Sequence, residues 1–383
     1  MTTTKNNEHK KLNVPNLRFK EFQGEWEELG LSELLDFKNG LNPKPDKFGK
    51  GIKFISVMDI LNNAVITYDC IKASVDVTEK ELSDFSVEKG DILFQRSSET
   101  LEDIGRANVY MDDKTAIFGG FVIRGKKKGE YDPQYFNYLL RSPFARKRII
   151  PMGAGAQHFN IGQEGLSKVK LHFANIEEQK KIGNFLSLLD ERIATQNKII
   201  DRLQSLIKGI AQKIVRNNKP NVRLAECLEC KSSTLQESEV CEQGTYPVYG
   251  ANGIVGYLDN YSTEGEAVYI IKDGSGVGTV SYVTGKCSAT GTLNTLQAKE
   301  GYSLQYLYYM LKVFNFEPYK TGMAIPHIYF KDYGKAKVFC PSYTEQLQYA
   351  RLLYAIDNKL SIEQNILTEL SLQKQYLLRQ VFI

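Results

Sequence analysis

Long hydrophobic runs are missing from this sequence of 383 residues. No stretch of about eighteen consecutive apolar residues occurs, so the sequence predicts no membrane-spanning helix. The segment Met1–Lys20 is polar and lysine-rich and has no apolar centre, so we expect no signal peptide and a cytoplasmic protein. Residues 1–14 are predicted to form a disordered tail.

Metal-ligand spacings are also missing. The four histidines show none of the short intervals typical of metal sites. Six cysteines are scattered along the chain, and Cys227-x-x-Cys230 has no second pair at the distance of a zinc ribbon. A ligand set extended to Cys241 and Cys287 fits no standard site, so we favour reduced cytosolic thiols and predict no metal.

Catalytic motifs are absent as well, because neither a nuclease pattern of the type Pro-Asp…Asp/Glu-x-Lys nor a Ser/His/Asp set can be identified. The run Asp132-Pro-Gln-Tyr135 is close to the Asp-Pro-Pro-Tyr box with which amino-methyltransferases hold a flipped base. Its third position is Gln, and no glycine-rich cofactor loop accompanies it. Asp132 and Pro133 instead suit the start of a capped helix. The sequence therefore predicts a binding protein that performs no catalysis and binds no cofactor itself.

Charge is nearly balanced, with 49 basic and 45 acidic residues and a net charge of +4. The excess lies within residues 176–219, which contain nine basic and five acidic residues. This is weak evidence for a polyanionic partner, and a solvated helix face is the alternative explanation.

A long amphipathic segment occurs twice, as Ile176–Arg216 and Tyr343–Ile383, and a shift of 167 residues superimposes the copies. In each copy the steps between seam positions alternate between four and three, which predicts a coiled-coil seam. The first seam comprises Ile182, Leu186, Leu189, Ile193, Gln196, Ile200, Leu203, Ile207, Ile210 and Ile214. The second comprises Tyr349, Leu353, Ile356, Leu360, Glu363, Leu367, Leu370, Lys374, Leu377 and Val381.

A polar residue interrupts both seams at the same place, Gln196 in the first copy and Glu363 in the second. Either these positions lean toward the surface, or they form a buried polar pair that fixes register and orientation. In an antiparallel arrangement the midpoints of the two helices meet, and the two residues lie near each other. A helix of about 40 residues is roughly 60 Å long, so such a pair forms a rod between two globular units.

Each globular half has the pattern of an α/β domain, with strand-like runs such as Asp91–Gln95, Ala116–Ile123 and Ala267–Ile271. Both halves contain a short helix that begins at a capping residue, Asp132 in the first and Ser303 in the second. The sequence thus predicts an α/β class in which two globular domains alternate with two long helices. The helices are expected to form an antiparallel coiled coil with pseudo-two-fold symmetry. The predicted boundaries are 15–175, 176–219, 220–342 and 343–383.

Both halves also share an order of short motifs. Each opens with a similar tag and closes with a glycine-rich stretch, a basic strand and a Glu-Gln pair before the long helix. In the first half these are Trp26–Glu33, Gly153–Ile161, Lys168–Lys170 and Glu178-Gln179. In the second they are Val222–Glu226, Gly322–Ile328, Lys335–Lys337 and Glu345-Gln346. This double ordering resembles the specificity subunit of type I restriction–modification systems over the whole chain after about residue 14. One departure is Ala174, which stands where the second copy has Pro341.

The resemblance implies that each globular unit is a target-recognition domain that reads one half of a bipartite, asymmetric sequence in double-stranded DNA. The helices would set the spacing and dock two methylation subunits, which bind S-adenosylmethionine and methylate adenine at N6. Motor–nuclease subunits using ATP and Mg²⁺ would join for restriction. Two alternatives remain: a specificity subunit whose partner fuses methyltransferase and nuclease, and a coiled-coil adaptor that joins two modules for a non-DNA ligand.

Candidate DNA-binding residues are polar side chains on projecting loops, since such side chains read base edges. In the first half they are Arg96, Ser97, Ser98, Arg106, Gln157, His158 and Asn160, with Lys44 as a phosphate contact. In the second half they are Lys272, Ser275, Thr290, Thr292, His327 and Tyr329. Ordinary exposed polar loops are the alternative. The stretch Gly274–Gly278 is predicted to be a turn between strands, although its backbone amides could also face a phosphate.

Overall fold

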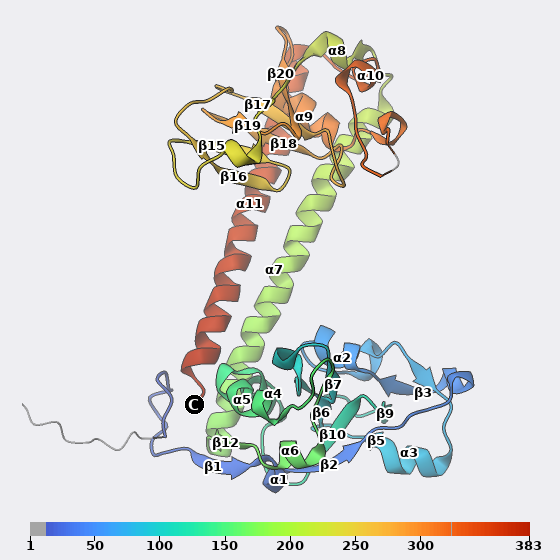
Figure 1. Cartoon of the computed structure of the whole chain (residues 1–383), viewed down its shortest axis with the longest axis vertical. Coiled ribbons are helices and arrows are strands. Elements are labelled where there is room, and N and C mark those ends of the chain that lie inside the picture. The colour runs from blue at the N-terminus through green and yellow to red at the C-terminus, as the bar shows by residue number, and fades with distance from the viewer. Residues whose placement is uncertain (1–12, 323) are drawn as a thin grey trace, which may run out of the picture. The chain divides into compact units, whose positions relative to one another are not determined.

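The computed structural model describes residues 13–322 and 324–383, and the chain divides into two compact units (Figure 1). Unit 1 comprises the chain up to Thr195 together with Leu367–Ile383, and unit 2 comprises Gln196–Ile366. Of the predicted tail, only Asn13 and Val14 fall within the described residues. Each unit therefore contains one globular domain and a part of both long helices.

The two long helices are α7, Ile176–Asn217, and α11, Tyr343–Gln380. Within unit 1 they run antiparallel: Asp190 is ion-paired with Lys374, and the earlier α7 residue Leu186 shares a buried cluster with the later α11 residue Leu377. Apolar seam positions are buried along both helices, as are Glu178, Ala211 and Ala350, which lie off the predicted seam. The buried apolar seam residues are Ile182, Leu186, Ile200, Ile207 and Ile214 in α7, Leu353, Leu360, Leu370 and Leu377 in α11, and Val381 directly after α11. The prediction of paired coiled-coil helices within an α/β fold is confirmed.

Unit 1 is built around two four-stranded sheets, ordered β2-β10-β6-β8 and β4-β3-β9-β5, with two further strand pairs, β1-β12 and β7-β11. The strands are β1 Glu27–Gly30, β2 Leu35–Asn39, β3 Phe48–Ile55, β4 Ser74–Val75, β5 Ser86–Val87, β6 Ile92–Gln95, β7 Ser97–Ser98, β8 Ala107–Val109, β9 Ala116–Phe118, β10 Val122–Lys127, β11 Phe159–Asn160 and β12 Lys170–Phe173. The helices are α1 Leu31–Leu34, α2 Val57–Asn62, α3 Glu79–Phe85, α4 Pro133–Arg141, α5 Pro143–Ile149 and α6 Gln163–Ser167.

Unit 2 has a corresponding four-stranded sheet, ordered β14-β20-β17-β18, a corresponding pair β13-β21, and a three-stranded sheet β16-β15-β19. Its strands are β13 Val222–Arg223, β14 Leu228–Ser232, β15 Tyr246–Gly250, β16 Gly253–Leu258, β17 Ala267–Ile271, β18 Val280–Val283, β19 Ser288–Ala289, β20 Leu293–Ala298 and β21 Lys337–Val338. Its short helices are α8 Leu224–Cys227, α9 Leu304–Lys312 and α10 Phe330–Tyr333.

The repeated Glu-Gln pair attaches each globular domain to its long helix. The side-chain oxygen of Gln179 accepts a hydrogen bond from the backbone N–H of Asp132 at 2.9 Å, and Gln346 does the same for Ser303 at 2.9 Å. Asp132 and Ser303 in turn cap α4 and α9 by accepting the N–H three residues later. The capped-helix prediction is confirmed, and Tyr135, the tyrosine of the methyltransferase-like run, is buried in the core of unit 1.

One predicted strand is divided. The run Ala116–Ile123 forms β9 and the start of β10, which are separated by a turn at Gly119 and Gly120. A Cβ atom on Gly120 would lie 1.9 Å from the side-chain oxygen of Asn42, so a larger residue would have to displace that side chain. The turn exposes Phe121, which a continuous strand would have placed in the sheet.

The polar residues of the two seams lie together inside unit 2. The amide of Gln196 donates hydrogen bonds to the backbone carbonyl of Glu363, at 2.9 Å, and to its carboxylate. Both side chains are buried. Hydrogen bonds from Lys359 and Gln196 hold the pKa of Glu363 below its ordinary value, so the carboxylate is ionised at neutral pH. The interpretation of these residues as surface-leaning is therefore wrong, whereas their role in register stays a prediction.

Replacing Gln196 and Glu363 together by leucine is expected to raise the midpoint of thermal unfolding and to permit more than one helix register. Removing both partners leaves no buried charge unpaired, and an apolar seam no longer penalises a shifted alignment. Crosslinking through paired cysteines placed in and out of register measures the alignment. A double variant that crosslinks only in the original register would contradict the assigned role.

No helix within residues 13–322 and 324–383 combines the length and apolar character needed to cross a membrane.

Candidate nucleic-acid interface

The candidate interface of unit 1 begins where β6 ends and β7 pairs with β11. This pairing joins two segments nominated separately from the sequence: Ser97 donates a hydrogen bond to the side-chain oxygen of Asn160 at 2.5 Å. The backbone carbonyl of Arg96 accepts from the N–H of Ile161 at 2.9 Å. Arg96, Ser97 and Asn160 thus form one surface although they are about sixty residues apart in the chain.

Gln157 and His158 project from a closed loop beside this surface. Two backbone hydrogen bonds between Ala154 and Asn160, 2.9 and 2.8 Å long, close the loop. Gly155 adopts a φ of +143°, and a Cβ atom there would lie 2.1 Å from the carbonyl oxygen of His158. The glycine-rich sequence is therefore needed to form the loop, and Gln157 and His158 are exposed on it.

A third segment of the interface, the turn between β9 and β10, was missed by the sequence analysis. The N–H of Arg96 donates to the carbonyl of Phe121 at 2.9 Å, and the Arg96 guanidinium donates to the carbonyl of Gly120 at 3.2 Å. The Phe121 side chain is 67% exposed, which is unusual for a phenylalanine. The Gly119-Gly120 pair was the signal in the sequence that could have indicated this turn.

The backbone hydrogen bonds around Arg96, Phe121 and Asn160 form what we call the interface frame. Unit 2 repeats this frame with different side chains. The carbonyl of Lys272 accepts from the N–H of Ile328 at 2.9 Å, and its own N–H donates to the carbonyl of Thr292 at 3.0 Å. Two backbone hydrogen bonds between Thr321 and His327, 2.9 and 2.8 Å long, close the corresponding loop. Lys272, Thr292 and His327 therefore occupy the positions of Arg96, Phe121 and Asn160.

The side chains at the unit 2 interface form their own contacts. A ring nitrogen of His327 lies 2.7 Å from the carboxylate of Asp273, and the exposed ring of Tyr329 stacks near it with a centroid separation of 6.5 Å. Thr290 is buried, and its hydroxyl lies 2.9 Å from that of Thr292, so it supports its neighbour and does not reach the surface. Ser275 is exposed on the turn between β17 and β18, which confirms the predicted turn at Gly274–Gly278.

The remaining nominated cations of unit 1 lie apart from the centre of the frame. Arg106 is ion-paired with Asp103 at 2.6 Å, and hydrogen bonds from Thr100 and Arg106 lower the pKa of that carboxyl. Lys44 lies in a separate exposed loop before β3. The ammonium groups of Lys47, in the same loop, and Lys50, in β3, both lie 3.6 Å from the carboxylate of Asp76. Lys44, by contrast, has no ion-pair partner among the described residues.

The cysteines do not gather around a common point in the described part of the chain, where no cluster of three or more His, Cys, Asp or Glu side chains suits a metal ion. All six cysteines are free. Cys227 is hydrogen-bonded with Cys340, which together with burial raises the pKa of the Cys227 thiol. Burial also raises the pKa of Cys230 to about 11, so its thiol is protonated at neutral pH.

Comparison with known families identifies this architecture. The model of the "Type I restriction modification DNA specificity domain" matches residues 23–205 and 218–372, one copy for each half of the repeat. The chain belongs to this family. It is a type I specificity subunit, as its motif order indicated.

Curated relatives of this specificity subunit are moderately similar. A putative type I restriction enzyme MjaX specificity subunit from Methanocaldococcus jannaschii is 28% identical over 211 residues, which span 54% of this chain and 49% of the relative. A putative type I specificity subunit from Mycoplasma genitalium is 26% identical over 281 residues, which span 66% of this chain and 71% of the relative. The match thus extends over about half of the archaeal relative's length.

A solved structure supports the fold. The crystal structure of an S subunit from M. genitalium matches with a TM-score of 0.66 and 20% identity, and covers 97% of this chain and 99% of that chain. Sequence and fold of this specificity subunit therefore agree on two specificity domains combined with two long helices. Within each domain the shared frame presents a different set of side chains.

Proposed function

We propose that this specificity subunit reads a bipartite, asymmetric sequence in double-stranded DNA, with one half-site read by each unit. The observation that carries this proposal is the common backbone frame with unlike side chains. Arg96, Phe121 and Asn160 stand in unit 1 where Lys272, Thr292 and His327 stand in unit 2. A conserved frame with variable contacts is the arrangement expected of two readers that recognise two different half-sites.

The chemistry of these side chains suits base recognition. Arginine and lysine donate to the acceptors of guanine, asparagine pairs with adenine, and threonine contacts either base type or a thymine methyl group. An exposed aromatic ring such as that of Phe121 offers an apolar surface to a thymine methyl group or to an unstacked base. Loops held by several backbone hydrogen bonds keep such groups in place before DNA arrives.

Partner subunits would supply the chemistry. Two methylation subunits dock on the long helices, bind S-adenosylmethionine and methylate adenine, and motor–nuclease subunits supply ATP- and Mg²⁺-dependent cleavage. The specificity subunit itself contributes recognition and spacing, with no catalytic step and no bound cofactor. Membership of the family and the paired helices support this division of labour.

Co-purification tests the partner assignment. Co-expression with its cognate methylation subunit should give a complex with two methylation subunits for each specificity subunit, measured by mass photometry. A single partner chain that carries both methyltransferase and nuclease would identify the fused type of system. A specificity subunit that purifies alone under these conditions would favour the adaptor alternative.

Arg96→Ala and Lys272→Ala are expected to weaken recognition of different half-sites. Losing a specific contact to a base costs about 1–3 kcal/mol, which corresponds to roughly a tenfold to hundredfold loss of affinity. Competition binding with duplexes altered in one half-site at a time measures the effect. A base contact relaxes specificity at one position, whereas a phosphate contact weakens all sites and lowers the salt slope by about one. Unchanged binding by both variants would contradict these assignments.

A further inference from the structure

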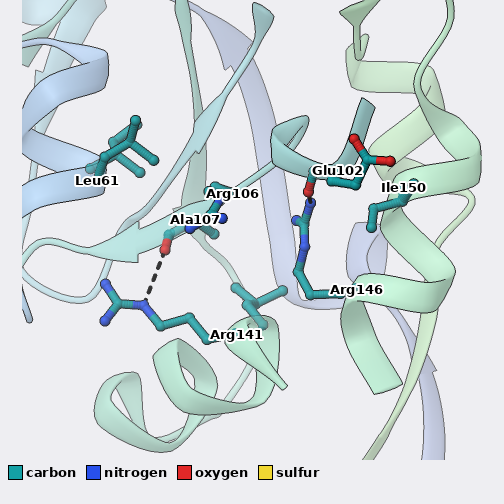
Figure 2. Close-up of a pocket in the computed structure, with 9 residues that line it drawn as sticks. Leu61, Glu102, Arg106, Ala107, Arg141, Arg146 and Ile150 are labelled. Carbon is teal, nitrogen blue, oxygen red and sulfur yellow. Dashed lines mark hydrogen bonds between the residues drawn. The ribbon is translucent and has the colours of Figure 1, made fainter. Parts of the chain in front are cut away.

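A pocket of about 360 Å³ opens in unit 1 between α2, β8, α4 and α5. Its lining includes three arginines, Arg106, Arg141 and Arg146, and a single acidic residue, Glu102. Figure 2 shows Arg141 and Arg146 approaching from the helical side toward the segments that carry Ala107 and Glu102. The volume lies within the range of small-ligand pockets, about 300–1,000 Å³.

Two of these arginines have no carboxylate partner in the described part of the chain. Arg141 donates to the backbone carbonyls of Ala107, at 3.5 Å, and Asn63, at 3.2 Å. Arg146 donates to the carbonyls of Glu102, at 2.9 Å, and Ile104, at 2.6 Å. Arg146 reaches the backbone carbonyl of Glu102, whereas the Glu102 carboxylate points away from Arg146 in Figure 2.

Arg146 has unused hydrogen-bonding capacity at this pocket. Its Nη1 atom is buried and lacks a hydrogen-bond partner among the residues that the structure describes. Burial, followed by the nearby charge of Arg106, lowers the pKa of Arg146 to about 10, and the charge of Asp103 offsets only part of this effect. A buried guanidinium without an anion is costly, and an oxyanion that accepts from its fork of donors removes that cost.

In unit 2 the residue equivalent to Arg141 does have a carboxylate partner. Lys312 stands where unit 1 has Arg141, at the shift of 171 residues that superimposes the two short helices. Its ammonium group lies 3.9 Å from the carboxylate of Asp357. The two units therefore differ at this position: Lys312 has a carboxylate partner, whereas Arg141 has none among the described residues.

We propose that the pocket of Arg106, Arg141 and Arg146 is an oxyanion site that takes a phosphate group, with the backbone of DNA bound by unit 1 as its source. The assignment of the source rests on the proposed function, because the pocket adjoins the interface frame: the carbonyl of Arg106 accepts from the N–H of Gln95, the residue before Arg96. Phosphate oxygens match the planar fork of arginine donors, and such contacts position a protein on the duplex without reading its sequence.

Calorimetric titration of the full chain with inorganic phosphate, at constant ionic strength in chloride buffer, tests the site itself. Arg146→Gln and Arg106→Gln are each expected to weaken phosphate binding roughly tenfold or more. Lys147→Gln is the matched control, since this exposed residue of α5 lies outside the pocket and its replacement removes the same charge. Arg106 is half-exposed, so its variant remains informative if Arg146→Gln fails to fold. Wild-type protein that does not bind phosphate, or variants that bind it as tightly as the control, would overturn the proposal.

A second measurement identifies the source of the phosphate. The salt dependence of binding to a random duplex should become shallower by about one unit in Arg146→Gln if the group belongs to DNA. An unchanged slope together with weakened phosphate binding would assign the site to a free phosphate compound. Phosphate binding by a protein that does not bind duplex would contradict the proposed function and leave the oxyanion site in place.

Discussion

Arg18→Met is expected to lower the free energy of unfolding of unit 1 by about 3 kcal/mol, because it removes the partner of a buried carboxylate. Two nitrogens of Arg18 donate to the two oxygens of Glu178, each at 2.8 Å. The Glu178 side chain is 0% exposed and that of Arg18 is 15% exposed. The hydrogen bonds to Glu178 raise the pKa of Arg18, so the guanidinium is charged at neutral pH.

Fluorescence of Trp26 measures this effect selectively. It is the single tryptophan of the chain, and its buried side chain lies in the core of unit 1. The double variant Arg18→Met/Glu178→Leu should recover much of the loss, since it leaves no charge buried. The control is Glu345→Gln, which changes the position equivalent to Glu178 in unit 2. Glu345 is exposed and bonded to Ser342, so a loss below about 1 kcal/mol is expected there. An unchanged Trp26 transition in Arg18→Met would contradict the assignment.

Phe382→Ala is expected to destabilise unit 1 by about 3 kcal/mol, a shift of roughly 6–12 °C in its unfolding midpoint. Phe382 follows α11, and its side chain is 1% exposed. Its ring lies 5.5 Å from that of Tyr135, at the centre of the unit 1 core. The end of the chain therefore completes the core of the domain that the beginning of the chain builds.

The equivalent position in unit 2 supplies the control for this prediction. A shift of 167 residues places Val215 opposite Phe382, and Val215 is 37% exposed. Val215→Ala should change the unfolding free energy by no more than about 0.5 kcal/mol, as is usual for surface positions. Equal effects of Phe382→Ala and Val215→Ala on their units would show that the chain end does not contribute to the core.

Features with a strong period or a local chemical signature were predictable from the sequence. The alternating four- and three-residue steps located both long helices, and the capping side chains of Asp132 and Ser303 located α4 and α9. The matched polar breaks pointed to Gln196 and Glu363, which lie together in the structure. Each of these signals depends on neighbours a few residues away on one helix.

Features that depend on long-range packing were not predictable. Phe121 belongs to a turn that brings it to Arg96, and its apolar side chain gave no reason to consider it as a surface residue. Thr290 was nominated for its polarity, but the backbone around it buries the side chain. The arginine pocket combines residues from several separate elements, and only Arg106 among its three cations was a candidate. Periodicity carries no information about which polar side chains of different elements converge.

The most direct test of the account is to co-express this chain with its methylation subunit in a host that lacks adenine methylation, and to map N6-methyladenine across the genome. We predict one bipartite motif with two unlike halves separated by a fixed unspecific spacer. Replacing unit 2 residues 220–342 by those of another specificity subunit should change one half and preserve the other. No new methylation, or a single contiguous motif, would contradict the proposal that the two units are separate readers of DNA.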